Sequence, residues 1–394
     1  MARRAVAVLL VGLAVAVQTW IFARYGSFNL DRIGSQDPAY HSDFETFWRS
    51  ADALLRGADI YRTGAGLPNL NPPLLTVVMT PFGLLEILPS YRLFVLVTVV
   101  LVLGCLLVVA REVRLPAVDT GLAVGAVLLG APLLATVGLG QIYAFLTVAL
   151  TGAWLAARRG HDVAAGAGIG IAVALKPSLA PLLLLPVLRR TPRPALAAVG
   201  TAAAGTLLGV AVCGLDASLT WVRLVLDHPA QTFFDNASLP ATLVRLTSNS
   251  GWGRPLVEVP GGLLVGSVLG AVIVLATLWL TRRPDTDGLG MWAVAAASLV
   301  ASPVTWNTYL VVLAPAVLVV LARSRAAAAP LLAIPLLGQE WPTLWYGDDG
   351  TAPALPLSLY CAVLLAHWAV FLRHALRGHA LRGAAVAPRV ASAE

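Results

Sequence analysis

Long apolar runs recur from one end of the 394-residue chain to the other, separated by short polar connections. Most runs approach the roughly 20 residues that an α-helix needs to cross the hydrocarbon core of a bilayer. The pattern predicts an all-α, polytopic integral membrane protein with about twelve transmembrane helices. The expected helices lie near residues 5–24, 92–110, 117–136, 140–157, 163–176, 178–189, 195–213, 259–281, 288–303, 307–322, 326–340 and 356–373.

Three apolar segments need separate interpretation. The runs 163–176 and 178–189 are too short to cross alone, so we expect a hairpin of short helices with Lys176-Pro177-Ser178 at its tip, because proline ends helical hydrogen bonding. The segment 70–89 is interrupted by four prolines and is expected to be re-entrant or interfacial. The run 5–24 lacks the small residues of a cleavage site, which favours an uncleaved first helix over a signal peptide.

Arginine placement predicts the orientation in a bacterial plasma membrane. Arginines cluster in alternate connections and near both ends of the chain, and the positive-inside rule places such segments in the cytoplasm. Both termini, including a basic tail over 374–394, are then cytoplasmic. The loops 25–91, 214–258 and 341–355 lie outside and hold most of the acidic residues. In this interpretation residues 1–394 form one membrane domain whose functional loops are periplasmic.

Composition agrees with this interpretation. Hydrophobic residues make up 58% of the chain and charged residues 12%, about half of the charged share of a soluble protein. The net charge of +7 comes from arginines between apolar runs, which favours a lipid bilayer over nucleic acid as the partner. Cys105, Cys213 and Cys361 lie in apolar runs without metal-binding spacing. No nucleotide-binding, zinc-peptidase or serine-nucleophile motif occurs.

The first outside loop carries the most informative polar sequence. From Phe44 onward, apolar residues recur at helical spacing until Gly57. This predicts an amphipathic helix in the membrane interface with its aromatic side chains toward lipid. Asp43 stands just before this helix. Its carboxylate is suited either to cap the helix by accepting from a backbone amide or to be the reactive group of an external site.

Further polar residues stand at the edges of the apolar runs, each with two open interpretations. Lys176, the sole lysine, either binds a lipid phosphate or extends to the headgroups. Arg245 is either a second phosphate ligand or an ordinary loop arginine. Gln141 either caps a helix or hydrogen-bonds a sugar hydroxyl. The turn at Trp306 either anchors in the interface or forms a wall of a substrate cavity.

Several short motifs, taken in order, resemble those of glycosyltransferase family 87. They are Ser42-Asp43-Phe44 with Phe47-Trp48, Leu54-Leu55 with Gly57-Ala58-Asp59-Ile60-Tyr61, Asn71-Pro72-Pro73, Pro81-Phe82-Gly83-Leu84-Leu85, Gly140-Gln141, Ala174-Leu175-Lys176-Pro177, Asn236-Ala237-Ser238-Leu239 and Ser302-Pro303-Val304-Thr305-Trp306. Each motif is weak alone, whereas the ordered set spans nearly the whole chain and is fairly specific. The resemblance implies a membrane-embedded GT-C fold and a polyprenyl-phosphate sugar as donor substrate, used on the periplasmic face without a cofactor.

The resemblance also implies roles for particular residues. Asp43 would be the catalytic base, while Lys176 and Arg245 would bind the donor phosphate, with no metal required. A carboxylate that takes the proton of an attacking hydroxyl typically contributes about 10²–10⁴-fold to the rate. Inversion needs only this one base, because the leaving phosphate requires no protonation. The expected substrate-binding residues are His41, Glu45, Trp48, Asp59, Asn71, Gln141, Asn236, Trp306 and Asn307.

More than one sugar donor and more than one function remain open from the sequence. The family includes actinobacterial α-mannosyltransferases and cell-envelope arabinofuranosyltransferases, so the resemblance favours mannose and leaves decaprenyl-phosphate-arabinose as the other donor. The expected acceptor is a cell-envelope glycolipid or polysaccharide. Family mannosyltransferases tend to carry Asp-His or His-His after Ser-Pro-x-x-Trp, whereas this chain has Asn307-Thr308-Tyr309. A transporter for a lipid-linked sugar, or a noncatalytic member of an envelope complex, are the competing functions.

Overall fold

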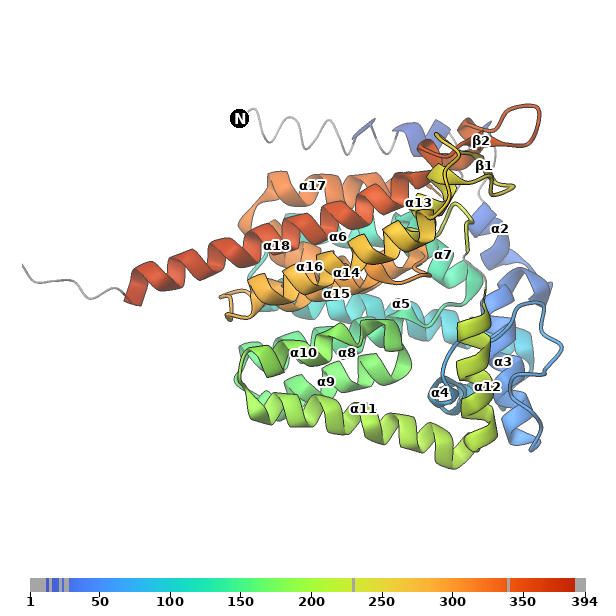
Figure 1. The fold of residues 1–394 in the computed structure, drawn as a ribbon, viewed down its shortest axis with the longest axis horizontal. Coiled ribbons are helices and arrows are strands. Elements are labelled where there is room, and N and C mark those ends of the chain that lie inside the picture. The colour runs from blue at the N-terminus through green and yellow to red at the C-terminus, as the bar shows by residue number, and fades with distance from the viewer. Residues whose placement is uncertain are drawn as a thin grey trace, which may run out of the picture.

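The computed structural model of the chain is built almost entirely of helices (Figure 1). It describes residues 12–13, 16–20, 23–24, 28–228, 231–338 and 341–386. The predicted first helix, 5–24, falls mostly outside these residues. Strands in the described part of the chain are limited to β1 (Gly253–Arg254) and β2 (Ala352–Pro353), which pair in parallel. The predicted all-α class is therefore confirmed.

Four helices in the described ranges are long and apolar enough to cross a membrane. They are α5 (Ile87–Glu112), α11 (Pro192–Cys213), α14 (Gly262–Thr281) and the segment Pro356–Gly378, which includes most of α18 (Leu359–Val386). Many leucine and valine side chains of α5, α11 and α14 are exposed. Apolar side chains on an outer helix face are stable where lipid, rather than water, surrounds them.

The predicted helix at 117–136 is two helices rather than one. α6 (Ala117–Leu129) and α7 (Ala131–Leu139) meet at an angle of 46°. The backbone is extended at Gly130, and Pro132 in the first turn of α7 has no amide hydrogen with which to continue α6. Counted as one bent span, this pair brings the possible crossings among the described residues to five.

The hairpin expected around Lys176 is present. α9 (Asp162–Leu175) ends where the backbone of Lys176 becomes extended, and Pro177 begins a short 3-10 turn that leads into α10 (Pro181–Leu188). The proline-rich segment 70–89 contains a short helix, α4 (Pro73–Gly83), and the start of α5. The remaining apolar runs form α8 (Tyr143–Arg158), α15 (Leu289–Ala301), α16 (Leu310–Arg323) and α17 (Arg325–Ala333).

The core of the bundle lies along α15 and α16. Every residue from Leu289 to Val300 is buried, as is every residue from Leu310 to Val320. A helix that is apolar on all sides is buried either in lipid or in protein, and here neighbouring helices cover both α15 and α16. The neighbouring α14 and α18 are joined by a hydrogen bond that Trp368 Nε1 donates to Thr277 Oγ1 at 2.8 Å.

The two ends of the bundle differ in composition. At the right-hand end in Figure 1 lie α2 (Phe28–Gly34), α3 (Ser42–Leu55), α4, α12 (Leu215–Asp227), α13 (Leu239–Thr247) and the two strands. The arginine-rich connections lie at the opposite end, where Arg323 pairs with Asp287 and Arg325 with Asp119. The three loops predicted to lie outside therefore gather at one end. The last helix, α18, extends to Val386 through part of the predicted basic tail.

Helix α3 forms as expected but differs from the prediction in three details. It ends at Leu55, and Gly57 takes a left-handed conformation with φ +68°. Its aromatic residues do not face lipid: Phe44 is fully buried, and its ring packs against Phe94 of α5 with centroids 5.2 Å apart. Helical periodicity identifies an apolar face but not what covers it. The helix begins at Ser42, so the capping role considered for Asp43 is also wrong.

Candidate active site

A cavity of about 520 Å³ lies among the loops and short helices at the end of the bundle that carries α3 and α12. This volume falls in the usual range for small-molecule sites. Asp43, Asn71, Gln141, Lys176 and Trp306, which are far apart in the sequence, all line it. The full lining is Asp43, Thr46, Phe47, Leu67, Pro68, Leu70, Asn71, Pro72, Gln141, Tyr143, Lys176, Pro177, Ser178, Trp221, Val225, His228, Gln231, Leu263, Ser302, Pro303, Val304 and Trp306.

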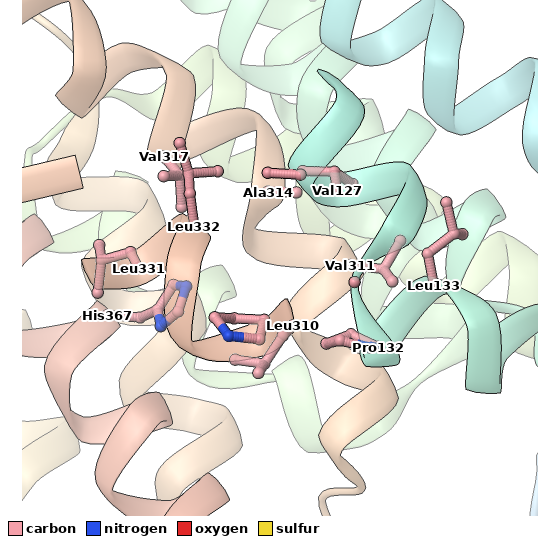
Figure 2. A pocket seen from close by; sticks show the side chains of 13 residues that line it. Val127, Pro132, Leu133, Leu310, Val311, Ala314, Val317, Leu331, Leu332 and His367 are labelled. Atoms are coloured by element: carbon pink, nitrogen blue, oxygen red, sulfur yellow. The ribbon is translucent and has the colours of Figure 1, made fainter. Parts of the chain in front are cut away.

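A second cavity lies within the bundle and is much smaller. Figure 2 shows its apolar lining, with His367 as the polar side chain that approaches it. Its volume of about 30 Å³ accommodates little more than a water molecule. A sugar phosphate does not fit there, whereas the cavity at the end of the bundle has the volume and the polar lining of a candidate active site.

Asp43 lies in the first turn of α3 and faces the large cavity. Burial raises the pKa of its carboxyl group to about 6, while a hydrogen bond from Gln141 and the positive charges of Arg32 and Lys176 act to lower it. The group is still mainly ionised at pH 7 and is a stronger base than an exposed aspartate. A base whose pKa lies near the working pH is well suited to accept a proton during a reaction.

The chain before Gln141 is held against α3 by a close contact. Gly140 ends α7 in the left-handed region, with φ +76°. A Cβ atom at this position would overlap Cβ of Phe44. Glycine is therefore required both by the backbone conformation and by the approach of α3. This contact brings Gln141 beside Asp43, which supports the suggestion that the Gly140-Gln141 motif belongs to the site.

Lys176 lies where the backbone breaks between α9 and the following 3-10 turn. Its Nζ atom lies over the ring of Tyr309, 5.4 Å from the ring centroid. Tyr309 packs in turn against Tyr143, with centroids 4.1 Å apart. An ammonium over an aromatic face is stabilised by the ring quadrupole. Lys176 is thus a cation with a fixed position on the cavity wall, suited to contact an anionic group.

Two other predicted residues also line the cavity. The backbone amide of Asn71 and its side-chain Nδ2 both donate to Oδ1 of Asn69, at 3.0 and 3.3 Å. Trp306 contributes an aromatic side chain from the turn before α16. Both types of group are common in sites that bind polar, ring-shaped ligands.

Sequence reasoning missed several residues of the cavity wall. Tyr143 begins α8, and Trp221 comes from α12, where its Nε1 donates to the carbonyl of Leu70 at 3.1 Å. His228 and Gln231 lie together, with their Nε2 atoms 2.8 Å apart. The helical spacing of apolar residues over 215–227 was the available signal for Trp221. The other positions depend on contacts between distant segments, which leave no local pattern.

Arg245 lies outside the cavity and is fully buried. Its guanidinium donates to the carbonyls of Phe233 at 2.7 Å and Asn236 at 3.0 Å, and to Thr242 Oγ1 at 3.1 Å. Burial lowers its pKa to about 10, so it remains charged at neutral pH. Through these bonds Arg245 holds the preceding loop in place. Because its guanidinium is fully buried there, Arg245 does not reach a donor phosphate in the cavity.

Asn236 also lies outside the cavity and joins two loops. Its Nδ2 donates to the carbonyls of Gln231 at 2.8 Å and Pro303 at 3.1 Å. Its Oδ1 accepts from the amides of Ser238 and Thr305. These bonds fix the segment 231–238 against the turn that carries Trp306. Asn307, also outside the cavity, reinforces this junction through its amide, which donates to the carbonyl of Asp235 at 2.8 Å.

The other four predicted residues bind other partners and do not line the cavity. The His41 ring lies between the carbonyls of Gly138 and Ser35. Glu45 pairs with Arg49 at 2.7 Å, and Trp48 donates to the carbonyl of Leu85. Asp59 accepts from the amide of Tyr61 at 2.8 Å. In the part of the chain that the structure describes, no three His, Cys, Asp or Glu side chains gather as metal ligands would.

The cavity therefore brings together one basic carboxylate, one fixed cation, three side-chain amides, a histidine and two tryptophans. A carboxylate can remove the proton of an attacking hydroxyl, and a cation can stabilise the charge of a departing phosphate. Amide and aromatic groups orient a polar ring between them. The arrangement is suited to group transfer from a phosphate ester to a hydroxyl.

Comparison with known proteins gives the family. The model of glycosyltransferase family 87 matches residues 69–303, a range that includes Asn71, Gln141 and Lys176, while Asp43 precedes it and Trp306 follows it. The polyprenol-phosphate-mannose-dependent alpha-(1-2)-phosphatidylinositol mannoside mannosyltransferase of Mycobacterium tuberculosis is 30% identical over 79% of this chain and 74% of its own length. The protein of the same description from Mycolicibacterium smegmatis is 27% identical over 71% and 69%.

Two further likenesses are weaker. An alpha-(1->3)-arabinofuranosyltransferase of Mycobacterium tuberculosis is 32% identical over 40% of this chain and 38% of its own length. The crystal structure of ArnT from Cupriavidus metallidurans bound to undecaprenyl phosphate covers 97% of this chain and 79% of that chain, with 19% identity and a TM-score of 0.38. A likeness of that degree identifies neither substrate nor mechanism. The family match and the long alignment with the first relative together show that this chain belongs to glycosyltransferase family 87.

Proposed function

We propose that the protein transfers mannose from polyprenyl-phosphate-mannose to a cell-envelope glycolipid or polysaccharide, with inversion at the anomeric carbon. The observation that carries the proposal is that Asp43 and Lys176 face one cavity. The relatives that align with most of the chain are mannosyltransferases that depend on polyprenol-phosphate-mannose. The arabinofuranosyltransferase aligns with less than half of it, so arabinofuranose is the second candidate.

In the proposed reaction, an acceptor hydroxyl attacks the anomeric carbon while Asp43 takes its proton. The bond between that carbon and the phosphate oxygen breaks on the opposite face of the sugar. The polyprenyl phosphate leaves with both electrons of that bond, and Lys176 stabilises the added negative charge. Gln141 holds the Asp43 carboxylate by its hydrogen bond. Since phosphate leaves as an anion, no acid is needed.

We further propose that the chain takes the GT-C arrangement, crosses the membrane about twelve times and has both termini in the cytoplasm. The active-site end of the bundle is then periplasmic. The segregation of arginine-rich turns to the other end supports this orientation. The exposed side chains of α12 at this end include Leu215, Leu219 and Leu226, while Trp221 and Val225 line the cavity. Such a helix suits the membrane surface and provides an apolar edge for a polyprenyl chain.

Incubation of the purified protein with each of two donors tests the donor and the stereochemistry. Polyprenyl-phosphate-mannose and decaprenyl-phosphate-arabinose are supplied separately with a membrane glycolipid acceptor, and the product is identified by mass spectrometry and its anomeric configuration by NMR. We expect a mannosylated product with the configuration opposite to that of the donor. Retained configuration would contradict the single-base mechanism, and product from the arabinose donor alone would replace mannose by arabinofuranose.

A further inference from the structure

We propose that Trp306, Phe233 and Trp252 form an aromatic ladder that binds the sugar chain of the acceptor as it enters the active site. The ligand class is an oligosaccharide or glycolipid acceptor with more than one sugar ring. This inference rests on the proposed function, because it assigns a binding subsite to the same transferase. None of the comparisons assigns a role to these three residues.

The three rings follow one another from the cavity to the molecular surface. Trp306 lines the cavity that contains Asp43. The centroid of the Phe233 ring lies 6.5 Å from that of Trp306 and 4.8 Å from that of Trp252, and both pairs meet edge to face, at interplanar angles of 71° and 85°. Trp252 is 45% exposed. The ladder thus begins inside the site and ends on an open surface.

The backbone that carries the ladder is held by several bonds. Arg245 donates to the carbonyl of Phe233, and Asn236 pairs with Trp306 in an isolated bridge. Next to Trp252, β1 pairs with β2 through Gly253 and Ala352. A side chain added at Gly253 would meet Leu357 at 2.8 Å, so this strand is closely packed. A surface whose rings are already positioned binds a ligand at a lower entropic cost than a mobile one.

The chemistry of the ladder suits sugar rings. A sugar ring presents C–H groups on its faces and hydroxyl groups at its edge. The faces can cover an aromatic ring and remove its apolar surface from water, while the hydroxyl groups remain solvated. Each ring that presents a face, above all the half-exposed Trp252, can therefore bind one sugar without requiring a particular hydroxyl pattern.

The surroundings of Trp252 favour a glycan over a hydrocarbon chain. The nearby Arg254 and Asp349 side chains lie 3.7 Å apart and are both more than half exposed. Charged groups that need water are poorly placed against lipid tails. The exposed apolar residues of α12 offer the polyprenyl chain a more suitable surface. We therefore assign the ladder to the acceptor rather than to the lipid of the donor.

The main rival is that Trp252 anchors the protein in the lipid headgroups, as aromatic residues do at membrane interfaces. The two roles differ in their dependence on the length of the acceptor. An anchor affects all acceptors alike. A ladder contact several ångströms from the reacting sugar affects long acceptors and leaves a single sugar unchanged.

The test measures glycan binding to the purified full-length protein without donor. Isothermal titration compares methyl α-mannoside, α-mannobiose and α-mannotriose, and the matching α-arabinofuranosyl series, for wild type, Trp252→Ala and Trp345→Ala. Trp345 is a suitable control, because it is 41% exposed and contacts Trp341 rather than the ladder. We expect wild-type affinity to rise with chain length in one series. Trp252→Ala should weaken the trisaccharide roughly 2- to 10-fold, the range of one aromatic contact.

We also expect the single sugar to bind Trp252→Ala with the wild-type affinity. Trp345→Ala should bind every ligand with the wild-type affinity. The inference is overturned if wild-type affinity does not rise with length in either series. Equal weakening of all ligands by Trp252→Ala, or equal effects of both tryptophan variants, overturns it as well. The product assay with the two donors shows separately whether mannose transfer itself fails. The titration is independent of that outcome, because it measures binding without turnover.

Discussion

The ammonium of Lys176 lies over the ring of Tyr309, 5.4 Å from its centroid. Tyr309 follows the Trp306 turn by three residues, and its ring packs between Lys176 and Tyr143. The ring gives the sole lysine of the chain a defined position on the cavity wall. The proposed donor-phosphate contact therefore depends on an aromatic side chain that does not itself line the cavity.

Replacement of Tyr309 tests this dependence. Tyr309→Leu removes the ring and should raise the donor KM roughly fivefold, equivalent to about 1 kcal/mol for one cation–π contact. Tyr309→Phe keeps the ring and should retain the wild-type KM. Steady-state kinetics with varied donor measures both. If Tyr309→Phe is as defective as Tyr309→Leu, the hydroxyl group rather than the ring is what matters.

The raised pKa of Asp43 predicts the pH dependence of the reaction. The base acts in its ionised form, and its pKa is about 6. Activity should therefore be constant above this pH and fall about tenfold per pH unit below it, as protonation removes the base. Gln141→Leu deletes a hydrogen bond that lowers the pKa, so it should move the acidic limb to higher pH. Profiles of kcat/KM against pH for the two proteins measure the shift. An acidic limb at the same pH in both proteins would show that Gln141 does not affect the pKa of Asp43.

Arg245 is predicted to act in stability rather than in donor binding. Arg245→Met leaves the buried carbonyls of Phe233 and Asn236 without their charged donor, at a cost of about 1.5–3 kcal/mol. Thermal unfolding in detergent should show a clear fall in Tm. Arg254→Met is the control, because Arg254 pairs with exposed Asp349 at the surface and should change Tm little. A higher donor KM with unchanged Tm in Arg245→Met would instead restore the phosphate-ligand role.

Gly140 and Gly160 provide a matched pair for the contact between α7 and α3. Both have φ near +75°, so alanine costs about 1–2 kcal/mol of backbone strain at each position. Only at Gly140 would the added methyl group overlap Phe44, beside the proposed base. Gly140→Ala should abolish activity and lower Tm strongly, whereas Gly160→Ala should remain active. Similar behaviour of the two variants would show that α3 is free to move away.

The sequence was most informative where a proline or a glycine marks the end of a helix. Pro177 marked the end of α9 and thereby the position of Lys176, and Gly57 marked the end of α3. The Gly140-Gln141 motif was associated with the site by the resemblance, and the structure places Gly140 in the left-handed turn that ends α7. Local sequence governs such features through backbone conformation. The family resemblance then connected these separate points to Asp43.

Other residues could not be assigned from sequence, because their environment arises from distant segments. An arginine in a polar loop has the same local pattern whether it binds a phosphate or, like Arg245, the carbonyls of its own loop. Phe44 fits a lipid-facing helix equally well until α5 is seen to cover it. The bend at Gly130 depends on how α6 and α7 pack, since an apolar run with one proline also fits a single helix.

The central claim is that Asp43 is the base of a mannosyl transfer, and Asp43→Asn tests it most directly. Asparagine keeps the size of the side chain and its place beside Gln141 but cannot accept the proton. Product formation from polyprenyl-phosphate-mannose is followed by mass spectrometry for both proteins, with donor binding and Tm as controls for folding. We expect the variant to bind donor, to keep its Tm and to lose about 10²–10⁴-fold in rate. A folded Asp43→Asn protein that transfers mannose at the wild-type rate would contradict the account.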